Sequence, residues 1–205
     1  MPRAIDLATG CRPDWRASLP ILTGAIVVVR EVRAEDAESL HEALFVPEIV
    51  AASPLVAPVG DDAAAFGRFI DAAHRDRAAG HRLCFGIVPR GCDIAIGLIE
   101  VCAMETAFHR AEWRAAIAPE FWGSGVFGDG AKLVLNFLFG TVGAQRLEAR
   151  ASVTNVRANG ALLKIGAIRE AMLRSSSSRT GRNPDQILWT ILAEDWHSAP
   201  PVVIH

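Results

Sequence analysis

The sequence predicts an α/β domain of the α+β type, built on one mixed, mostly antiparallel sheet of about seven strands with flanking helices. Three observations indicate this fold class. Short runs rich in β-branched residues alternate with segments of helical periodicity. Three strand-like runs follow one another with short links between residues 82 and 119, which requires antiparallel pairing. A glycine-rich turn then opens an apolar helix, and a strand–helix–strand unit follows it.

The first half of the chain supplies one strand, two helices and the three successive strands. A β-branched run predicts a strand over Ile26–Arg33, and a helix starts near Ala34. The segment 46–61 contains three prolines and is predicted to be a loop. Residues 61–80 form a predicted helix, because two aspartates suit its positive N-terminal end and Gly80 suits its stop.

The second half continues with helices and strands in alternation. Residues 130–142 are apolar on nearly all sides, which predicts a well-buried helix. Two further strand runs, a short helix ended by Gly166 and a polar serine-rich loop follow, and residues 186–196 are predicted to form the last strand. We expect an N-terminal extension at 1–22, one domain at 23–196 and a tail at 197–205.

Composition bounds the function. Apolar residues make up 51% of the 205 residues and the net charge is −2, which fits a globular domain and does not favour nucleic acid as a partner. No signal peptide and no uncharged apolar run of 18 residues appears, so we expect a cytoplasmic protein that does not bind membranes. The four cysteines lack C-x-x-C spacing and are expected to be structural, so no metal site is predicted.

The stretch FWGSGVFGDGAK, residues 121–132, is the strongest local signal. Read alone, its glycines fit the dinucleotide pattern G-x-G-x-x-G, and Glu148 follows 20 positions after Gly128. That motif belongs directly after a strand in repeating β-α-β units, whereas here PEFW intervenes and antiparallel strands precede it. The P-loop pattern fails because Ala131 and Lys132 follow Gly130 where it needs Lys and then Ser or Thr. What remains is that the small residues leave the backbone N–H groups exposed at the start of a helix. Such a helix start is suited to bind an anion such as a diphosphate.

With its neighbours, PEFWGSGVFGDGAKLVLNFLF resembles the acetyl-CoA-binding motif of the GNAT superfamily of N-acetyltransferases, in the RimJ/RimL-like (ribosomal-protein-alanine acetyltransferase) branch. The first strand and helix resemble those of the family. ASVTNVRANGALLKIGAIREAMLR resembles the branch's N-x-x-S…K-x-G-F-x-x-E-G stretch, and GRNPDQILWTILAEDW resembles its terminal strand. The resemblance covers roughly residues 20 to 196 and implies the GNAT fold.

The resemblance also implies where acetyl-CoA binds. The main chain of one strand would bind the pantetheine amides, a splay between that strand and QRLEARA would open a slot, and the glycine turn would hold the pyrophosphate. Asn155 would reach the pantetheine arm. The implied cofactor-binding residues are Ala115, Ala116, Ile117, Trp122, Gly123, Ser124, Gly125, Val126, Phe127, Gly128 and Asn155.

The catalytic equipment departs from the family pattern. The chain has no Tyr to act as the acid that many members use, Ala158 replaces the serine of N-x-x-S, and Phe127 stands where the pattern has a small residue. The candidates that remain are Glu112 on the cofactor strand as base, Ser177 as proton donor and Asn159 as substitute for the missing hydroxyl.

The reaction implied is the transfer of acetyl from acetyl-CoA to a primary amine, on a protein N-terminus or a small molecule, by direct attack in a ternary complex. The alternative is an acyl-CoA-binding protein with weak or no transferase activity, suggested by Ala158, Phe127 and the absent Tyr. The expected partners are acetyl-CoA and an amine acceptor. The N-terminal extension and the apolar tail PPVVIH could each serve a homodimer contact or cover the core.

Overall fold

The computed structural model describes residues 14–52, 62–174 and 184–198. Its strands are β1 (Leu22–Thr23), β2 (Val27–Glu31), β3 (Arg82–Pro89), β4 (Gly97–Ala103), β5 (Arg110–Ile117), β6 (Arg146–Ser152), β7 (Ile168–Leu173) and β8 (Gln186–Leu192). Its α-helices are α1 (Asp36–Leu44), α2 (Pro47–Ala52), α3 (Ala63–Ala79), α4 (Val126–Phe137), α5 (Val156–Lys164) and α6 (Ala193–Ser198). The short turns η1 (Thr106–Phe108), η2 (Pro119–Phe121) and η3 (Leu138–Val142) complete the described elements.

All eight described strands form one sheet in the order β1-β2-β3-β4-β5-β6-β8-β7. Every neighbouring pair is antiparallel except β5 and β6, which are parallel. The helix α4 and the turn η3 connect these two strands, as a parallel pair requires. The predicted fold class, a mixed and mostly antiparallel sheet with flanking helices, is therefore confirmed.

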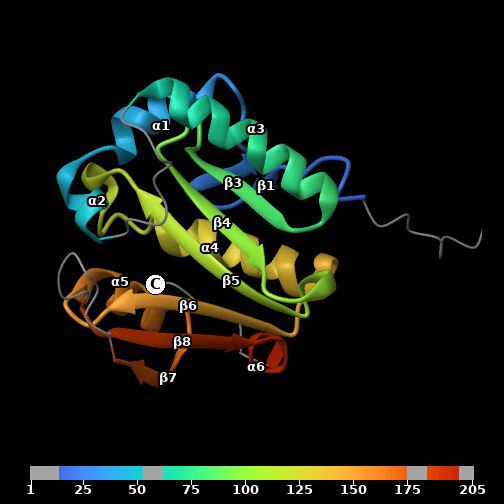
Figure 1. Cartoon of the computed structure of the whole chain (residues 1–205), viewed down its shortest axis with the longest axis vertical. Coiled ribbons are helices and arrows are strands. Elements are labelled where there is room, and N and C mark those ends of the chain that lie inside the picture. Colours follow the sequence, from blue (N-terminus) through green and yellow to red (C-terminus); the bar gives the residue numbers. More distant parts are fainter. Residues whose placement is uncertain (1–13, 53–61, 175–183, 199–205) are drawn as a thin grey trace, which may run out of the picture.

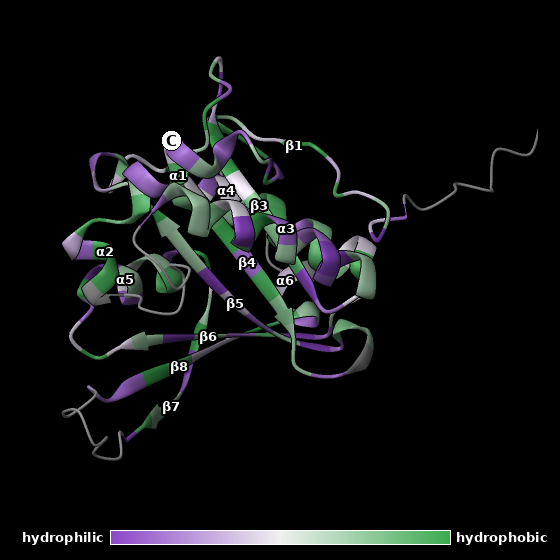
Figure 2. Ribbon diagram, turned by 45° about the horizontal axis from the view of Figure 1, so that its top comes forward, coloured by the Kyte–Doolittle hydropathy of each residue, from purple (hydrophilic) through white to green (hydrophobic). Residues whose placement is uncertain are grey.

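Helices cover the two faces of the sheet unequally. Figure 1 shows α1 and α3 over the face of β3 and β4, with α4 behind β4 and β5. The buried side chains divide accordingly, with Leu40, Phe66 and Ile70 in the core beneath α1 and α3, and Val134 and Leu135 of α4 in the core on the other face. The colouring of Figure 2 follows this burial, since β3 and β4 are largely hydrophobic while polar residues occupy the outer side of α3.

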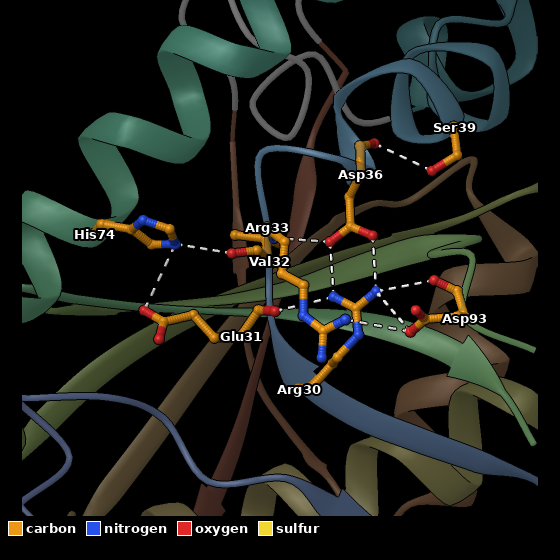
Figure 3. Close-up of polar contacts among 8 residues, drawn as sticks. All are labelled: Arg30, Glu31, Val32, Arg33, Asp36, Ser39, His74 and Asp93. Atoms are coloured by element: carbon orange, nitrogen blue, oxygen red, sulfur yellow. Dashed lines mark hydrogen bonds and ion pairs between the residues drawn. The ribbon is translucent and has the colours of Figure 1, made fainter.

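A buried ion pair fixes the start of α1 to β2. The Arg30 guanidinium donates to both carboxylate oxygens of Asp36, at 2.7 and 2.8 Å, and both side chains are buried. Asp36 also accepts from the backbone N–H of Arg33 at 2.7 Å, and Arg30 donates to the backbone oxygen of Asp93 at 3.1 Å (Figure 3). Because a buried charge needs such partners, this pair holds α1 against the sheet.

Two local predictions were wrong. The segment predicted to be a proline loop contains α2, because Pro47 occupies the first helical position, where its missing N–H costs nothing. The last strand ends at Leu192, not residue 196, since the following Ala-Glu-Asp suits a helix start and forms α6. The two-residue strand β1 brings the sheet, predicted to have about seven strands, to eight.

The predicted N-terminal extension is ordered against the body over its described part. Leu19 is buried, and the ring of Trp15 meets that of Phe108 edge-on, with centroids 5.5 Å apart. The backbone N–H of Leu19 donates to the Glu31 carboxylate at 3.3 Å. Residues 14–22 therefore cover one edge of the core, while the proposed domain boundaries stay predictions.

Candidate functional site

The parallel strands β5 and β6 pair at one end only. Their register runs from Arg110–Arg146 to Glu112–Glu148 and then stops, although both strands continue. Over the remaining residues β5 still pairs with β4, and β6 with β8. Figures 1 and 2 both show the two strands side by side at this paired end and diverging beyond it. The sheet is thus split by a splay at its centre.

The splay exposes one edge of β5, and strand alternation determines which residues present their main chain there. The N–H of Ala118 donates to Ile96 on the β4 side, at 2.9 Å, whereas the oxygen of His109 accepts from Gln145 on the β6 side. Because neighbouring residues in a strand point their peptide groups to opposite sides, Trp113, Ala115 and Ile117 face the splay. Ala116 pairs with Leu98 of β4, so its main chain points away.

The turn after β5 is anchored back onto that strand. Trp122 donates from Nε1 to the carbonyl oxygen of Ile117 at 2.9 Å, and Ser124 donates from Oγ to the oxygen of Phe121 at 2.6 Å. Gly123 and Gly125 have φ of 79° and 88°, in the left-handed region that favours glycine. The glycines thus allow a tight turn that brings the chain directly from the end of β5 into α4.

The helix α4 begins in this turn, earlier than the sequence predicts. Gly125 is its N-cap residue, so Val126, Phe127 and Gly128 form its first turn, and the backbone N–H groups of a first turn have no partner within the helix. A substituent at Gly123 or Gly128 would meet nothing within 4 Å, so the turn is open on that side. Bared amides and the helix dipole make this an anion-binding cradle at the end of the splay.

One carboxylate in the first turn of α4 does not disturb that cradle. Asp129 accepts hydrogen bonds from the backbone N–H groups of Ile26 and Val27, at 2.7 and 3.0 Å, and from Ala25 at 3.3 Å. Three donors therefore compensate its charge and clamp the turn between β1 and β2 onto α4. Sequence reasoning missed this role, because nothing in the residue pattern brings position 129 to residues 25–27.

On the far side of the splay, α5 is held by two asparagines. Asn155 is its N-cap and accepts from the N–H of Ala158 at 3.0 Å. Asn159 donates from Nδ2 to the oxygens of Ser152 and Asn155, both at 2.9 Å, and accepts from Trp189 Nε1 at 2.8 Å. Both polar atoms of Asn159 are thus occupied in holding the helix, which favours a structural role over the catalytic one that the sequence suggested.

Glu112 lies at the point where the strands separate, with its side chain 15% exposed. Arg114 contacts its carboxylate at 3.2 Å, and Arg150 reaches it across the splay from β6, at 3.6 Å. Glu148, its neighbour across the pairing, is buried and binds Arg110 and Arg146. The carboxylate of Glu112 is therefore at the head of the splay, and two guanidinium groups compensate its charge.

The structure brings most of the predicted site residues together around the splay. Those of β5, the glycine turn and α5 lie on its borders, whereas Ser177 and the rest of the serine loop lie outside the described residues. Within the described ranges no group of three or more His, Cys, Asp or Glu suits a metal ion, and no helix there has the length and apolarity to cross a membrane. Trp113, through its main chain, and Arg150 were not anticipated.

The chain resembles known acetyltransferases. Residues 27–168 match the model of the acetyltransferase (GNAT) domain family. Over 173 residues, 84% of this chain and 97% of the relative, it is 27% identical to the uncharacterized N-acetyltransferase YoaA of Bacillus subtilis (strain 168). Among solved structures, RimJ of Mycobacterium smegmatis in complex with CoA-disulfide has a TM-score of 0.74 at 19% identity, covering 90% of this chain and 91% of that one. The ribosomal-protein-S5-alanine acetyltransferase of Vibrio fischeri has a TM-score of 0.72 at 15% identity, covering 88% and 100%.

Proposed function

Because this chain belongs to the acetyltransferase (GNAT) family, we propose that it moves the acetyl group of acetyl-CoA onto a primary amine by direct attack in a ternary complex. The observation that carries the proposal is the splay between β5 and β6, which opens beyond Glu112 and Glu148 and leads to the glycine turn of α4. A long, thin thioester with a diphosphate at one end suits a slot with an anion cradle at its end.

The open edge of β5 supplies the groups that the thioester arm needs. The carbonyl of Trp113 and both the N–H and the carbonyl of Ala115 face the splay beyond the last pair of β5 and β6, so they can bond to the amides of pantetheine. The carbonyl oxygen of Ile117 already accepts a hydrogen bond from Trp122 Nε1, so it is less available to the amides of pantetheine. The amide of Asn155, from the other side, has its Nδ2 free of any partner among the described residues and can donate to the same arm.

In the reaction, the amine nitrogen attacks the thioester carbonyl carbon, the carbonyl oxygen becomes an oxyanion, and the carbon–sulfur bond then breaks. The N–H of Ala115, on the open edge of β5, is positioned to donate to that oxyanion. The thiolate leaves readily, because an alkyl thiol has a pKa of about 8.5. A general acid of the tyrosine type is therefore not essential at this step.

The proton lost by the amine needs an acceptor, and we assign it to Glu112, directly or through water. Its carboxylate is partly exposed at the head of the splay, where the acetyl carbon would lie. Its ion pairs with Arg114 and Arg150 orient it. Ser177 stays a predicted proton donor. The three hydrogen bonds that Asn159 makes argue against the catalytic role predicted for it.

For the acceptor we propose a primary amine on a protein N-terminus or a small molecule, as in the RimJ/RimL-like branch. We propose that the protein acts in the cytoplasm. Support comes from the motifs shared with that branch and from the likeness to a RimJ structure, which extends over 90% of the chain. A second function, acyl-CoA binding with weak or no transfer, is favoured by the absence of Tyr and by Ala158 in place of a serine.

Two measurements test the proposal. Isothermal titration with acetyl-CoA and with NAD should show binding of acetyl-CoA alone, and NAD binding without acetyl-CoA binding would overturn the assignment. Thiol release from acetyl-CoA should then rise above hydrolysis when a panel of peptides and small amines is added. Binding without any amine-dependent release would select the acyl-CoA-binding function. Glu112→Gln should lower kcat without changing the affinity for coenzyme A.

A further inference from the structure

A cation–aromatic stack joins the two sides of the splay. The guanidinium carbon of Arg157, in the first turn of α5, lies 3.5 Å from the centroid of the Trp122 ring, which belongs to the turn after β5. The ring cannot easily shift, because its Nε1 is bonded to the carbonyl of Ile117 at 2.9 Å. The position of Arg157 is equally defined, since Asn155 and Asn159 fix the first turn of α5. The contact therefore bridges the splay where β5 and β6 no longer pair.

Within the part of the chain that the structure describes, the Arg157 guanidinium lacks the carboxylate partner that four arginines of β5 and β6 have. Arg110, Arg114, Arg146 and Arg150 each lie within 4.0 Å of a glutamate carboxylate. The exposed Arg157 guanidinium has neither a carboxylate nor a hydrogen-bond acceptor among the described residues, and its stack on Trp122 uses only its face. Its N–H donors are thus available to an anion.

The location of the stack suggests which anion. Trp122 directly precedes the glycine turn, where the backbone N–H groups of Phe127 and Gly128 at the start of α4 have no partner within the helix and form the anion cradle. The guanidinium that rests on Trp122 therefore lies beside the residue that leads into the cradle. A planar guanidinium can give two parallel N–H bonds to phosphate oxygens, and such charge-assisted bonds are stronger than the stack it leaves.

We propose that Arg157 is a diphosphate-binding residue that rests on Trp122 in the free protein and moves onto the diphosphate of coenzyme A when the cofactor binds. This inference rests on the proposed function. It gives the cradle a second wall, formed from α5, because the amides of α4 hold the diphosphate from one side of the splay and Arg157 closes over it from the other. It also gives a role to a cation that has no carboxylate partner in the described part of the chain.

Binding of three probes to four proteins tests this role. Coenzyme A, inorganic pyrophosphate and phosphate-free pantetheine are titrated calorimetrically into the wild type, Arg157→Ala, Arg157→Lys and the control Arg169→Ala, which alters an exposed residue of the edge strand β7. We expect Arg157→Ala to lower the affinity for coenzyme A and for pyrophosphate about tenfold or more. The affinity for pantetheine should fall less than about twofold. The affinities of Arg157→Lys should lie between those of the wild type and Arg157→Ala, and the affinities of Arg169→Ala should match those of the wild type.

Salt gives an independent readout, because removal of one phosphate contact should make the affinity for coenzyme A fall less steeply with ionic strength. An equal loss of affinity for all three probes would mean that Arg157 only supports the fold. No loss of affinity for any probe would also overturn the inference, while the proposed function would stand. Failure of the wild type to bind coenzyme A at all would instead reject the proposed function and the inference with it. Should Arg157→Ala unfold, Arg157→Gln carries the same comparison.

Discussion

Phe127 packs its ring against Trp113, with the ring centroids 5.9 Å apart and the planes tilted by 43°. Phe127 lies in the first turn of α4 and Trp113 on β5, so the contact ties the glycine turn to the strand that borders the splay. The bulky residue that departs from the family pattern thus turns into the core on the α4 side. It leaves the backbone N–H groups of the turn uncovered.

This packing predicts a stability effect. Phe127→Ala should lower the free energy of unfolding by about 2 kcal/mol, less than for a fully buried phenylalanine because the ring is only partly buried. Urea-induced unfolding at pH 7 measures it. Leu163→Ala is the matched control, since Leu163 is 64% exposed on α5 and its loss should change the free energy by less than about 0.5 kcal/mol. Equal effects at the two positions would contradict the packing.

The buried carboxylate of Glu148 predicts a pH dependence. Burial alone would raise its pKa, but hydrogen bonds from Arg146 and Arg110 outweigh that and hold the pKa of Glu148 below its usual value. A lowered folded-state pKa stabilises the protein above the unfolded value of about 4.3, and this contribution is lost as the pH falls through the folded-state pKa. Glu148→Gln should therefore cost about 2 kcal/mol at pH 7 and progressively less below about pH 4.

Unfolding in urea at a series of pH values between 7 and 3 would measure this difference. Glu170→Gln serves as the comparison, because Glu170 also binds Arg146 but is 44% exposed, so its replacement should matter less. A Glu148→Gln deficit that stays constant down to pH 3 would show that the glutamate charge contributes nothing through these ion pairs.

The cysteines should differ sharply in reactivity. Burial, with a smaller effect of Glu100, raises the pKa of Cys102 to about 11, whereas Cys92 is exposed. At pH 8 a thiol of pKa 11 is about 0.1% thiolate, so Cys102 should react with an aromatic disulfide at least about 100-fold more slowly than Cys92. The assay uses a Cys11→Ser background, and Cys92→Ser should remove the fast phase. Two thiols labelled at one rate would refute the assignment.

The sheet was predictable because its signals are local. Short strand-like runs bounded by turn residues predicted β3, β4 and β5, and the short links between them required their antiparallel order. The glycine turn was equally predictable, since glycine is the residue that favours the φ of Gly123 and Gly125. These features depend on neighbours in the chain, which is what a sequence shows directly.

The remaining features depend on register and on contacts between distant segments. The alternation that turns Ala116 toward β4 and Trp113 toward the splay follows from pairing partners, not from residue type. The stack of Arg157 on Trp122 joins residues 35 positions apart, and no pattern links them. The structural role of Asn159 likewise appears only when Trp189 of β8 is seen beside it.

Gly125 offers a direct test of the cradle. Its φ of 88° disfavours any side chain, and a Cβ there would lie 3.3 Å from the Cδ1 atom of Ile26, the movable end of that side chain. Gly125→Ala should therefore cost about 1 kcal/mol of stability and weaken coenzyme A binding less than about tenfold. Gly125→Glu adds a carboxylate beside the amides of α4, and repulsion of the diphosphate should weaken binding more than about 100-fold.

Calorimetric titration with coenzyme A, alongside thermal unfolding of each variant, separates strain from charge. Gly140→Ala is the control, because a Cβ at Gly140 meets nothing within 4 Å and this glycine has no positive φ. If Gly125→Glu binds coenzyme A as well as Gly125→Ala does, the start of α4 does not hold the diphosphate. The loss should also shrink at high ionic strength for the glutamate variant alone, since salt screens repulsion but does not relieve backbone strain.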